Sequence, residues 1–421
     1  MSTIAVQPEE KWYKVINKQQ RAVLIASCCG WMLDSFDLMI FSFTMAAIMA
    51  EFHSNPGMMG LIATIGMFAA AFGGFAIGAL SDRIGRVKAM TTTILLYSLG
   101  SLACGFSQDY WQLLALRAVV GVGLGGQWTA GAALISETWP KEHRGKALGI
   151  MQSSYAAGSV LAALVASPII MAFGWRWLYI IGVLPALLLF YIGKHVKEPE
   201  IWQRQNKMET DCGTKSSRVL EIFKKGNFGK LFLGTIFAGF IMLATIPVGV
   251  WLPMYIGTPV SNGGAGVTGV SISLMTFPFY FGMILGTLSF GFLSDKYGRK
   301  NVFKIYLLFA FITWVLMVYI APISKIAYLV LSPISGFLGI ASYAGLGMVL
   351  SEMFRTRIRA TAMGFCYNIA RIFGGIYITL MGVLLPVFGL KNLLVFLGIF
   401  FLCAFVTAFF LKETVGIELE E

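Results

Sequence analysis

The chain has 421 residues, of which 57% are hydrophobic and only 12% are charged, and its formal net charge is +12. A soluble domain carries about 25% charged residues, so this composition excludes a water-soluble globular protein. The positive charge does not indicate a nucleic-acid partner, because most Lys and Arg residues lie in alternate loops between apolar segments.

Twelve apolar segments follow one another, and each is long enough to cross a hydrocarbon core of roughly 30 Å as a helix of about 20 residues. They begin near residues 22, 58, 88, 110, 146, 174, 231, 268, 302, 326, 359 and 391. Basic residues in every second loop follow the positive-inside rule. The sequence therefore predicts an all-α, multi-pass protein of the inner (plasma) membrane, with twelve transmembrane helices, both termini in the cytoplasm and the lipid bilayer as its surroundings.

The first segment contains two acidic residues, Asp34 and Asp37, one helical turn apart on one face. An ionisable group at bilayer depth is costly unless it is paired or faces water. Arg117, in the fourth segment, is expected at a similar depth. A neighbouring arginine favours an ionised carboxylate, whereas burial favours the protonated form. We therefore predict that these three residues couple transport to protons and that Asp34 is the main carrier. The alternative is a static ion pair.

Arg371 is the one charge expected in the middle of a segment in the second half of the chain, about 18 Å from the start of its helix. A guanidinium binds a carboxylate through two parallel hydrogen bonds, so Arg371 predicts an organic anion as substrate. Pairing with the first helix is the alternative. Polar and aromatic residues at similar depth are further candidates for substrate binding: Tyr155, Asn368, Gln152, Tyr367 and Gln127, followed by Trp128, Trp251, Tyr255 and Tyr343.

The sequence contains an internal repeat. Residues 78–86 (GALSDRIGR) correspond to 291–299 (GFLSDKYGR), with Asp295 lying 213 residues after Asp82 (295 − 82). Glu137 and Glu352 form a second corresponding pair, 215 residues apart (352 − 137). The repeat predicts two six-helix halves, residues 1–194 and 229–421, joined by a polar cytoplasmic linker at 195–228. Parallel repeats of this kind bind substrate between them near the bilayer midplane.

These loops resemble the signature of the major facilitator superfamily, Gly-x-Leu-x-Asp-Arg-x-Gly-Arg, and the resemblance covers the whole chain. Residues 33–37, 117–126 and 197–202 resemble the metabolite:H+ symporters, and especially the sialate:H+ symporter branch. The resemblance implies that charged residues of the repeated loops gate the cytoplasmic side, with a purely topological role as the alternative. The implied gating residues are Asp82, Arg83, Arg86, Glu137, Arg144, Asp295, Arg299, Glu352 and Arg359.

The sequence as a whole predicts a monomeric, proton-coupled symporter that imports a small organic anion by alternating access. A sialic acid, a monocarboxylate or an aromatic acid fits this branch. The proton gradient is the expected energy source, and no cofactor, metal or enzymatic activity is predicted, because the six cysteines lack metal-ligand spacing and no catalytic constellation is visible. The alternatives are a facilitative uniporter, a drug or metabolite antiporter, and a non-transporting nutrient sensor.

Overall fold

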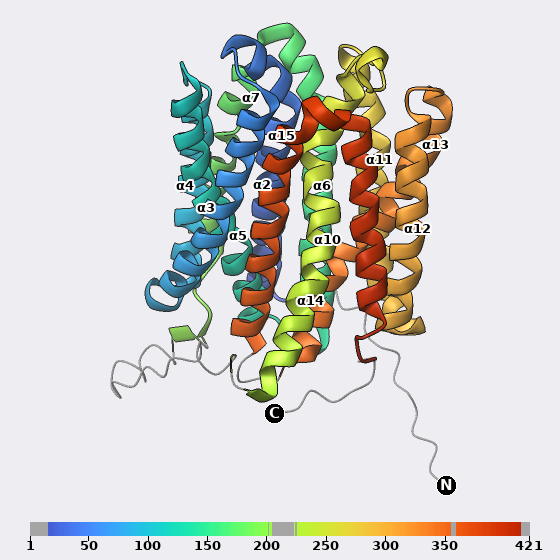
Figure 1. Cartoon of the computed structure of the whole chain (residues 1–421). Coiled ribbons are helices and arrows are strands. Elements are labelled where there is room, and N and C mark those ends of the chain that lie inside the picture. Colours follow the sequence, from blue (N-terminus) through green and yellow to red (C-terminus); the bar gives the residue numbers. More distant parts are fainter. Residues whose placement is uncertain (1–15, 201, 204–222, 224, 355–358, 414–421) are drawn as a thin grey trace.

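The computed structural model describes residues 16–200, 202–203, 223, 225–354 and 359–413, and their regular elements are all helices that run nearly parallel in one bundle (Figure 1). The first half contains α2 (Lys18–Glu51), α3 (Pro56–Ile84), α4 (Arg86–Cys104), α5 (Tyr110–Thr138), α6 (Lys141–Phe173), and a sixth span made of α7 (Arg176–Ile181), η1 (Leu184–Leu187) and α8 (Leu188–His195).

The second half contains α10 (Lys225–Gly257), η3 (Val260–Asn262), α11 (Val270–Tyr297), α12 (Arg299–Ile320), a tenth span made of α13 (Lys325–Gly339) and α14 (Ala341–Met353), and α15 (Arg359–Ala408). Of the predicted linker at 195–228, residues 204–222 lie outside the described residues, so the predicted half boundaries stay a prediction. The helix α10 begins inside that linker, at Lys225.

The last element, α15, contains two membrane spans. It has 50 residues, and Gly389 within it has a φ of 72°, which breaks the helical path. The described residues contain 11 candidate spans by length and hydropathy, the last of which is this double helix. The predicted twelve transmembrane helices are therefore confirmed.

Several helices begin where the sequence offers a capping side chain. Asn17 forms a capping box with Gln20 at the start of α2, and Asn55 caps α3 directly before Pro56 at the first helical position. Asp109 accepts hydrogen bonds from two backbone N–H groups of α5. These caps satisfy N–H groups that have no partner within the helix, and they favour the start of α2, α3 and α5 at these residues.

The repeated loops form two equivalent turns. Gly85 (φ 109°) joins α3 to α4, and Gly298 (φ 93°) joins α11 to α12, a backbone region that favours glycine. In the first turn Glu198 accepts hydrogen bonds from the backbone N–H groups of Arg86, Val87 and Lys88 at 2.8, 3.0 and 3.2 Å. A carboxylate at a helix N-terminus is also stabilised by the helix dipole.

The second half repeats this arrangement with Glu413, which accepts from the N–H groups of Arg299 and Lys300 at 2.9 and 3.2 Å. Glu413 lies 215 residues after Glu198 (413 − 198), the same separation as between Glu137 and Glu352. The repeat therefore includes a third pair, Lys197-Glu198 and Lys412-Glu413. In each half, the glutamate connects the segment after the last helix to the start of the third helix, α4 or α12.

Replacement of Gly85 by alanine is expected to lower stability by about 1–3 kcal/mol, because alanine disfavours this φ and its Cβ would collide with the Glu198 carboxylate. The measurement is the thermal unfolding midpoint of the purified protein in detergent. Gly149→Ala on α6 is the matched control, since a Cβ there meets nothing within 4 Å and alanine is the better helix former. A Gly85→Ala midpoint equal to that of the control would contradict this account.

The two halves pack most closely at one end of the bundle. We call this the distal end, where α3, α5 and α11 begin, and the opposite end, where α2 begins, the terminal end. At the distal end a Cβ on Gly60 would lie 2.8 Å from the Cα of Thr379, and Thr64 Oγ1 lies 2.6 Å from Thr379 Oγ1. The backbone N–H of Ser167 donates to Ser273 Oγ at 3.2 Å between α6 and α11.

At the terminal end, glycines of both halves border open space. A Cβ on Gly149 of α6, on Gly347 of α14 or on Gly364 of α15 would meet no atom within 4 Å. The structure is therefore closed at the distal end, where the helices of the two halves meet at backbone distance.

Candidate functional site

The two acids of α2 are buried but have different partners. Asp34 and Asp37 are each 1% exposed. Asp37 Oδ2 accepts a hydrogen bond from Arg117 Nη1 of α5 at 2.8 Å, and the guanidinium of Arg117 lies 5.4 Å from the ring centroid of Phe41. This ion pair lies within the first half. It holds Arg117 against α2 with its charge balanced.

Asp34 lies near ionisable groups of both halves, Tyr97 of α4 among them. It interacts electrostatically with Arg371 of α15, yet no ion pair within 4.0 Å joins the two. Its Oδ2 is buried and has no hydrogen-bond partner among the described residues. A buried, unpaired charge is costly. In this structure Arg117 is bonded to Asp37, and Asp34 has no ion pair among the described residues. The predicted proton coupling by Asp34, Asp37 and Arg117 stays a prediction.

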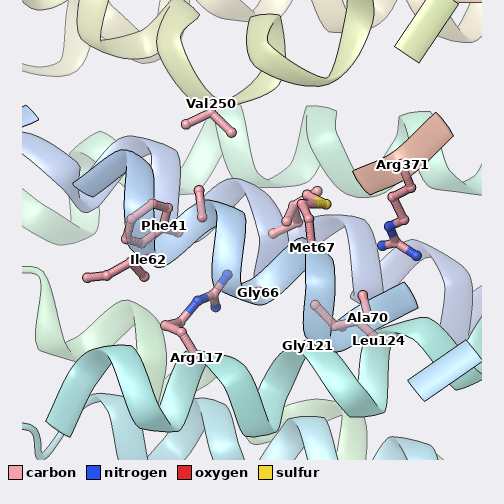
Figure 2. A pocket seen from close by; sticks show the side chains of 12 residues that line it. Phe41, Ile62, Gly66, Met67, Ala70, Arg117, Gly121, Leu124, Val250 and Arg371 are labelled. Atoms are coloured by element: carbon pink, nitrogen blue, oxygen red, sulfur yellow. The ribbon is translucent and has the colours of Figure 1, made fainter. Parts of the chain in front are cut away.

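Arg371 borders two adjoining cavities between the halves. The first, of about 380 Å³, is also lined by Arg117, Gly66 and Met67. Figure 2 shows the two arginines on opposite sides of this cavity, with Gly66 and Met67 between them. No hydrogen bond or ion pair of the Arg371 side chain is found among the described residues. Its guanidinium is therefore available to a ligand in the cavity.

The second cavity, of about 590 Å³, adds hydroxyl groups from both halves. Tyr155 and Ser159 of α6 line it from the first half, and Thr245, Tyr280 and Tyr343 line it from the second. Of these five, only Tyr155 was a leading candidate from the sequence; isolated hydroxyl residues in apolar spans carry no signal that distinguishes a cavity wall from packing.

An aromatic cluster adjoins the second cavity on its terminal side. Trp128 of α5 stacks on Tyr367 of α15 with ring centroids 5.1 Å apart and an interplanar angle of 0°. The Tyr367 hydroxyl forms a short hydrogen bond with the hydroxyl of Tyr343. On the other side, Trp128 Nε1 donates to Gln152 Oε1 at 3.3 Å. These contacts connect the two halves through side chains of four helices.

Of the six predicted substrate ligands, Arg371 and Tyr155 line the two cavities. Tyr367 and Gln152 belong to the adjoining aromatic cluster, and the other two lie elsewhere. Gln127 is fully buried inside the first half, where its Oε1 accepts a hydrogen bond from Thr93 Oγ1 at 2.8 Å and its amide packs against Gly30. Asn368 Nδ2 donates to the carbonyl of Gly364 at 2.9 Å on its own helix, and its amide lies near Gly74 of α3. Neither lines the two cavities. A role of Gln127 and Asn368 in substrate binding stays a prediction.

Four of the predicted gating residues form two ion pairs, each within one half. Arg86 donates to Glu137 at 2.8 and 3.0 Å and to Ser81 at 3.2 Å. Correspondingly, Arg299 donates to Glu352 at 3.2 and 3.3 Å and to Ser294 at 2.7 Å. Each pair joins the third and fourth helix of one half. The gating role stays a prediction, and the side chains of the other predicted gating residues lie outside the described ones: Asp82, Arg83, Arg144, Asp295 and Arg359.

Comparisons with known proteins agree with this architecture. A probable 4-methylmuconolactone transporter of Cupriavidus pinatubonensis is 32% identical over 97% of this chain and 94% of its own length. The sialic acid transporter NanX of Escherichia coli is 29% identical over 85% of each chain, in agreement with the predicted branch. The crystal structure of a D-xylose-proton symporter has the same fold, with a TM-score of 0.76 at 18% identity, covering 95% of this chain and 100% of that one.

The model of the Major Facilitator Superfamily matches residues 27–264 and 263–419, which together span almost the whole chain. With twelve transmembrane helices, an internal repeat and a cavity between its halves, this protein is a multi-pass membrane transporter, not an enzyme, and it belongs to the Major Facilitator Superfamily.

Proposed function

We propose that this transporter imports a small organic anion together with protons across the inner membrane, with its terminal end in the cytoplasm. The observation that carries the proposal is the buried Asp34 carboxylate beside Arg371, an arginine that borders both cavities and has no bonded partner among the described residues. The names of the relatives, which describe transporters of organic acids, support an organic acid as substrate.

The coupling follows from charge balance. The two acids of α2 and the two arginines carry no net charge when all four are ionised. A substrate carboxylate on Arg371 adds one negative charge in a region of low dielectric constant, which is costly. Protonation of Asp34 removes one negative charge, so that the substrate carboxylate alone balances the charge of Arg371. Each bound carboxylate is therefore accompanied by one proton.

The same competition orders the transport cycle. Asp34 binds its proton first, and the anion then binds Arg371. The loaded site has no net charge, which favours the conformational change that exposes it to the other side of the membrane. When the terminal end opens to the cytoplasm, loss of the anion leaves Arg371 free to favour the ionised form of Asp34 again. Asp37 and Arg117 stay paired throughout and carry no proton in this scheme. The basic loops at the terminal end support a cytoplasmic position of that end.

Internal pH tests this proposal. Purified protein in proteoliposomes with an internal pH dye is mixed with sialic acid, lactate, benzoate, nicotinate or cis,cis-muconate in separate runs. Acidification with a subset of these acids, absent in protein-free vesicles, is the expected result. Uptake of a labelled acid without acidification would indicate a uniporter, and no response to any acid together with no ligand-induced thermal shift would overturn the organic-anion assignment.

A further inference from the structure

Trp128 and Tyr367 form a parallel ring pair that joins the two halves. Trp128 belongs to α5 of the first half and Tyr367 to α15 of the second, so their separation changes whenever the halves move relative to each other. Each ring is also held in its plane by a polar contact, from Gln152 to the indole and from Tyr343 to the phenol. When the two halves move apart, these two parallel rings can separate and leave a flat gap between them. We call this gap between Trp128 and Tyr367 the slot.

The pair lies where the body of a bound anion would extend. Tyr367 precedes Arg371 by four residues on α15, so both side chains are on one face, about 5–6 Å apart at Cβ. Tyr343 connects the two locations, because it lines the cavity that contains Arg371 and its hydroxyl contacts that of Tyr367. A ligand whose carboxylate is on Arg371 is therefore within reach of the rings, although neither ring lines the two cavities in this structure.

We infer that Trp128 and Tyr367 select for planar, conjugated carboxylates, which insert between the two rings while Arg371 binds the carboxylate. The inference rests on the proposed function and narrows its substrate class. A flat ligand replaces the ring–ring contact by two contacts of the same kind, one on each of its faces, in the offset parallel geometry that aromatic groups prefer. A saturated or polyhydroxylated ring has axial atoms on both faces, so it requires a wider separation of the two rings than a flat ligand does.

The slot also explains why the rings belong to different halves. A planar anion between them contacts both halves at once, so binding energy depends on how far the halves are apart. Tyr155, which packs on Trp31 with centroids 4.9 Å apart and lines the second cavity, extends the aromatic surface on the side of the first half. Between the substrate types named for the relatives, this geometry favours the flat, unsaturated acid over the sialic acid.

The test compares acids that are matched in size and charge but differ in planarity: benzoate with cyclohexanecarboxylate, and cis,cis-muconate with adipate. Affinities are measured on the purified full-length protein by ligand-induced thermal shift and by counterflow in proteoliposomes. Stacking on one aromatic side chain changes affinity by about fivefold or more. The expected result is therefore at least fivefold tighter binding of the planar member of a pair by the wild-type protein.

Variants assign the preference to the two rings. Trp128→Leu and Tyr367→Leu are expected to remove the preference by weakening binding of the planar acid alone, whereas Tyr367→Phe retains it. Trp111→Leu is the matched control, because Trp111 is a tryptophan of the distal end that is 69% exposed. Binding of the non-planar acid by each Leu variant verifies that its site is folded. If a Leu variant binds neither acid, the planar preference is judged from the other Leu variant and from Tyr367→Phe.

Two results would overturn the inference. The first is equal affinity for both members of each pair, and the second is a planar preference that persists in both Leu variants. Either result would contradict selection by the slot but would leave the proposed transport of organic anions unaffected. If the wild-type protein binds none of the four acids, and none of the acids used to test the proposed function, the organic-anion assignment fails and the slot fails with it.

Discussion

Arg371→Lys is expected to weaken the apparent affinity for the transported anion by about 10- to 100-fold. Lysine keeps the positive charge beside Asp34, but it presents a single ammonium group and loses the two parallel hydrogen bonds of the guanidinium. Hydrogen bonds to charged groups contribute about 1.5–3 kcal/mol, and each 1.4 kcal/mol is a factor of ten in affinity. The concentration dependence of uptake and of counterflow measures this change.

A conservative change elsewhere provides the control for Arg371→Lys. Arg176 forms an ion pair with Glu51 at 2.6 Å near the distal surface, where the arginine side chain is 35% exposed. Arg176→Lys is expected to leave substrate affinity unchanged, because exposed pairs contribute little and the cavities are distant. An unchanged affinity in Arg371→Lys would move the substrate carboxylate to Arg117 on the opposite side of the first cavity.

The transmembrane architecture could be predicted from the sequence because bilayer thickness requires long apolar helices, which composition alone reveals. The repeated glycines at positions 85 and 298 could be recognised as paired turns for a similar reason, since their residue spacing is regular. The third repeated pair, Glu198 and Glu413, was missed because it consists of two residues and its partner atoms are backbone N–H groups, which have no sequence signal.

The pairing of charges inside the bundle could not be predicted from depth alone. Residues three apart on a helix differ by about 60° in direction, and this angle is enough to direct Asp37 to Arg117 within one half and Asp34 towards Arg371 of the other. Gln127 shows the same limitation, because its side chain accepts a hydrogen bond from Thr93 inside the first half. Helix rotation depends on packing between many side chains, which residue spacing does not give.

Asp34→Asn is expected to abolish proton-driven accumulation of the anion, while counterflow exchange persists. Asparagine is close to a protonated aspartate in shape and charge, so Arg371 stays available to the substrate, but no proton can be released on the cytoplasmic side. Accumulation is measured in proteoliposomes under an imposed pH gradient, and exchange is measured with labelled substrate and no gradient. Gradient-driven accumulation at the wild-type level would exclude Asp34 as the proton carrier.

Asp37→Asn tests whether the effect of Asp34→Asn is due to proton coupling or to the loss of any buried acid in α2. Asp37 is as buried as Asp34, but it neutralises Arg117 directly. Removal of one partner from a buried ion pair leaves an uncompensated charge, at a cost of about 3–5 kcal/mol. Asp37→Asn is therefore expected to lower the thermal midpoint strongly, whereas Asp34→Asn, whose carboxylate has no bonded partner among the described residues, keeps or raises it. The reverse order of midpoints would assign the static role to Asp34 and the proton to Asp37.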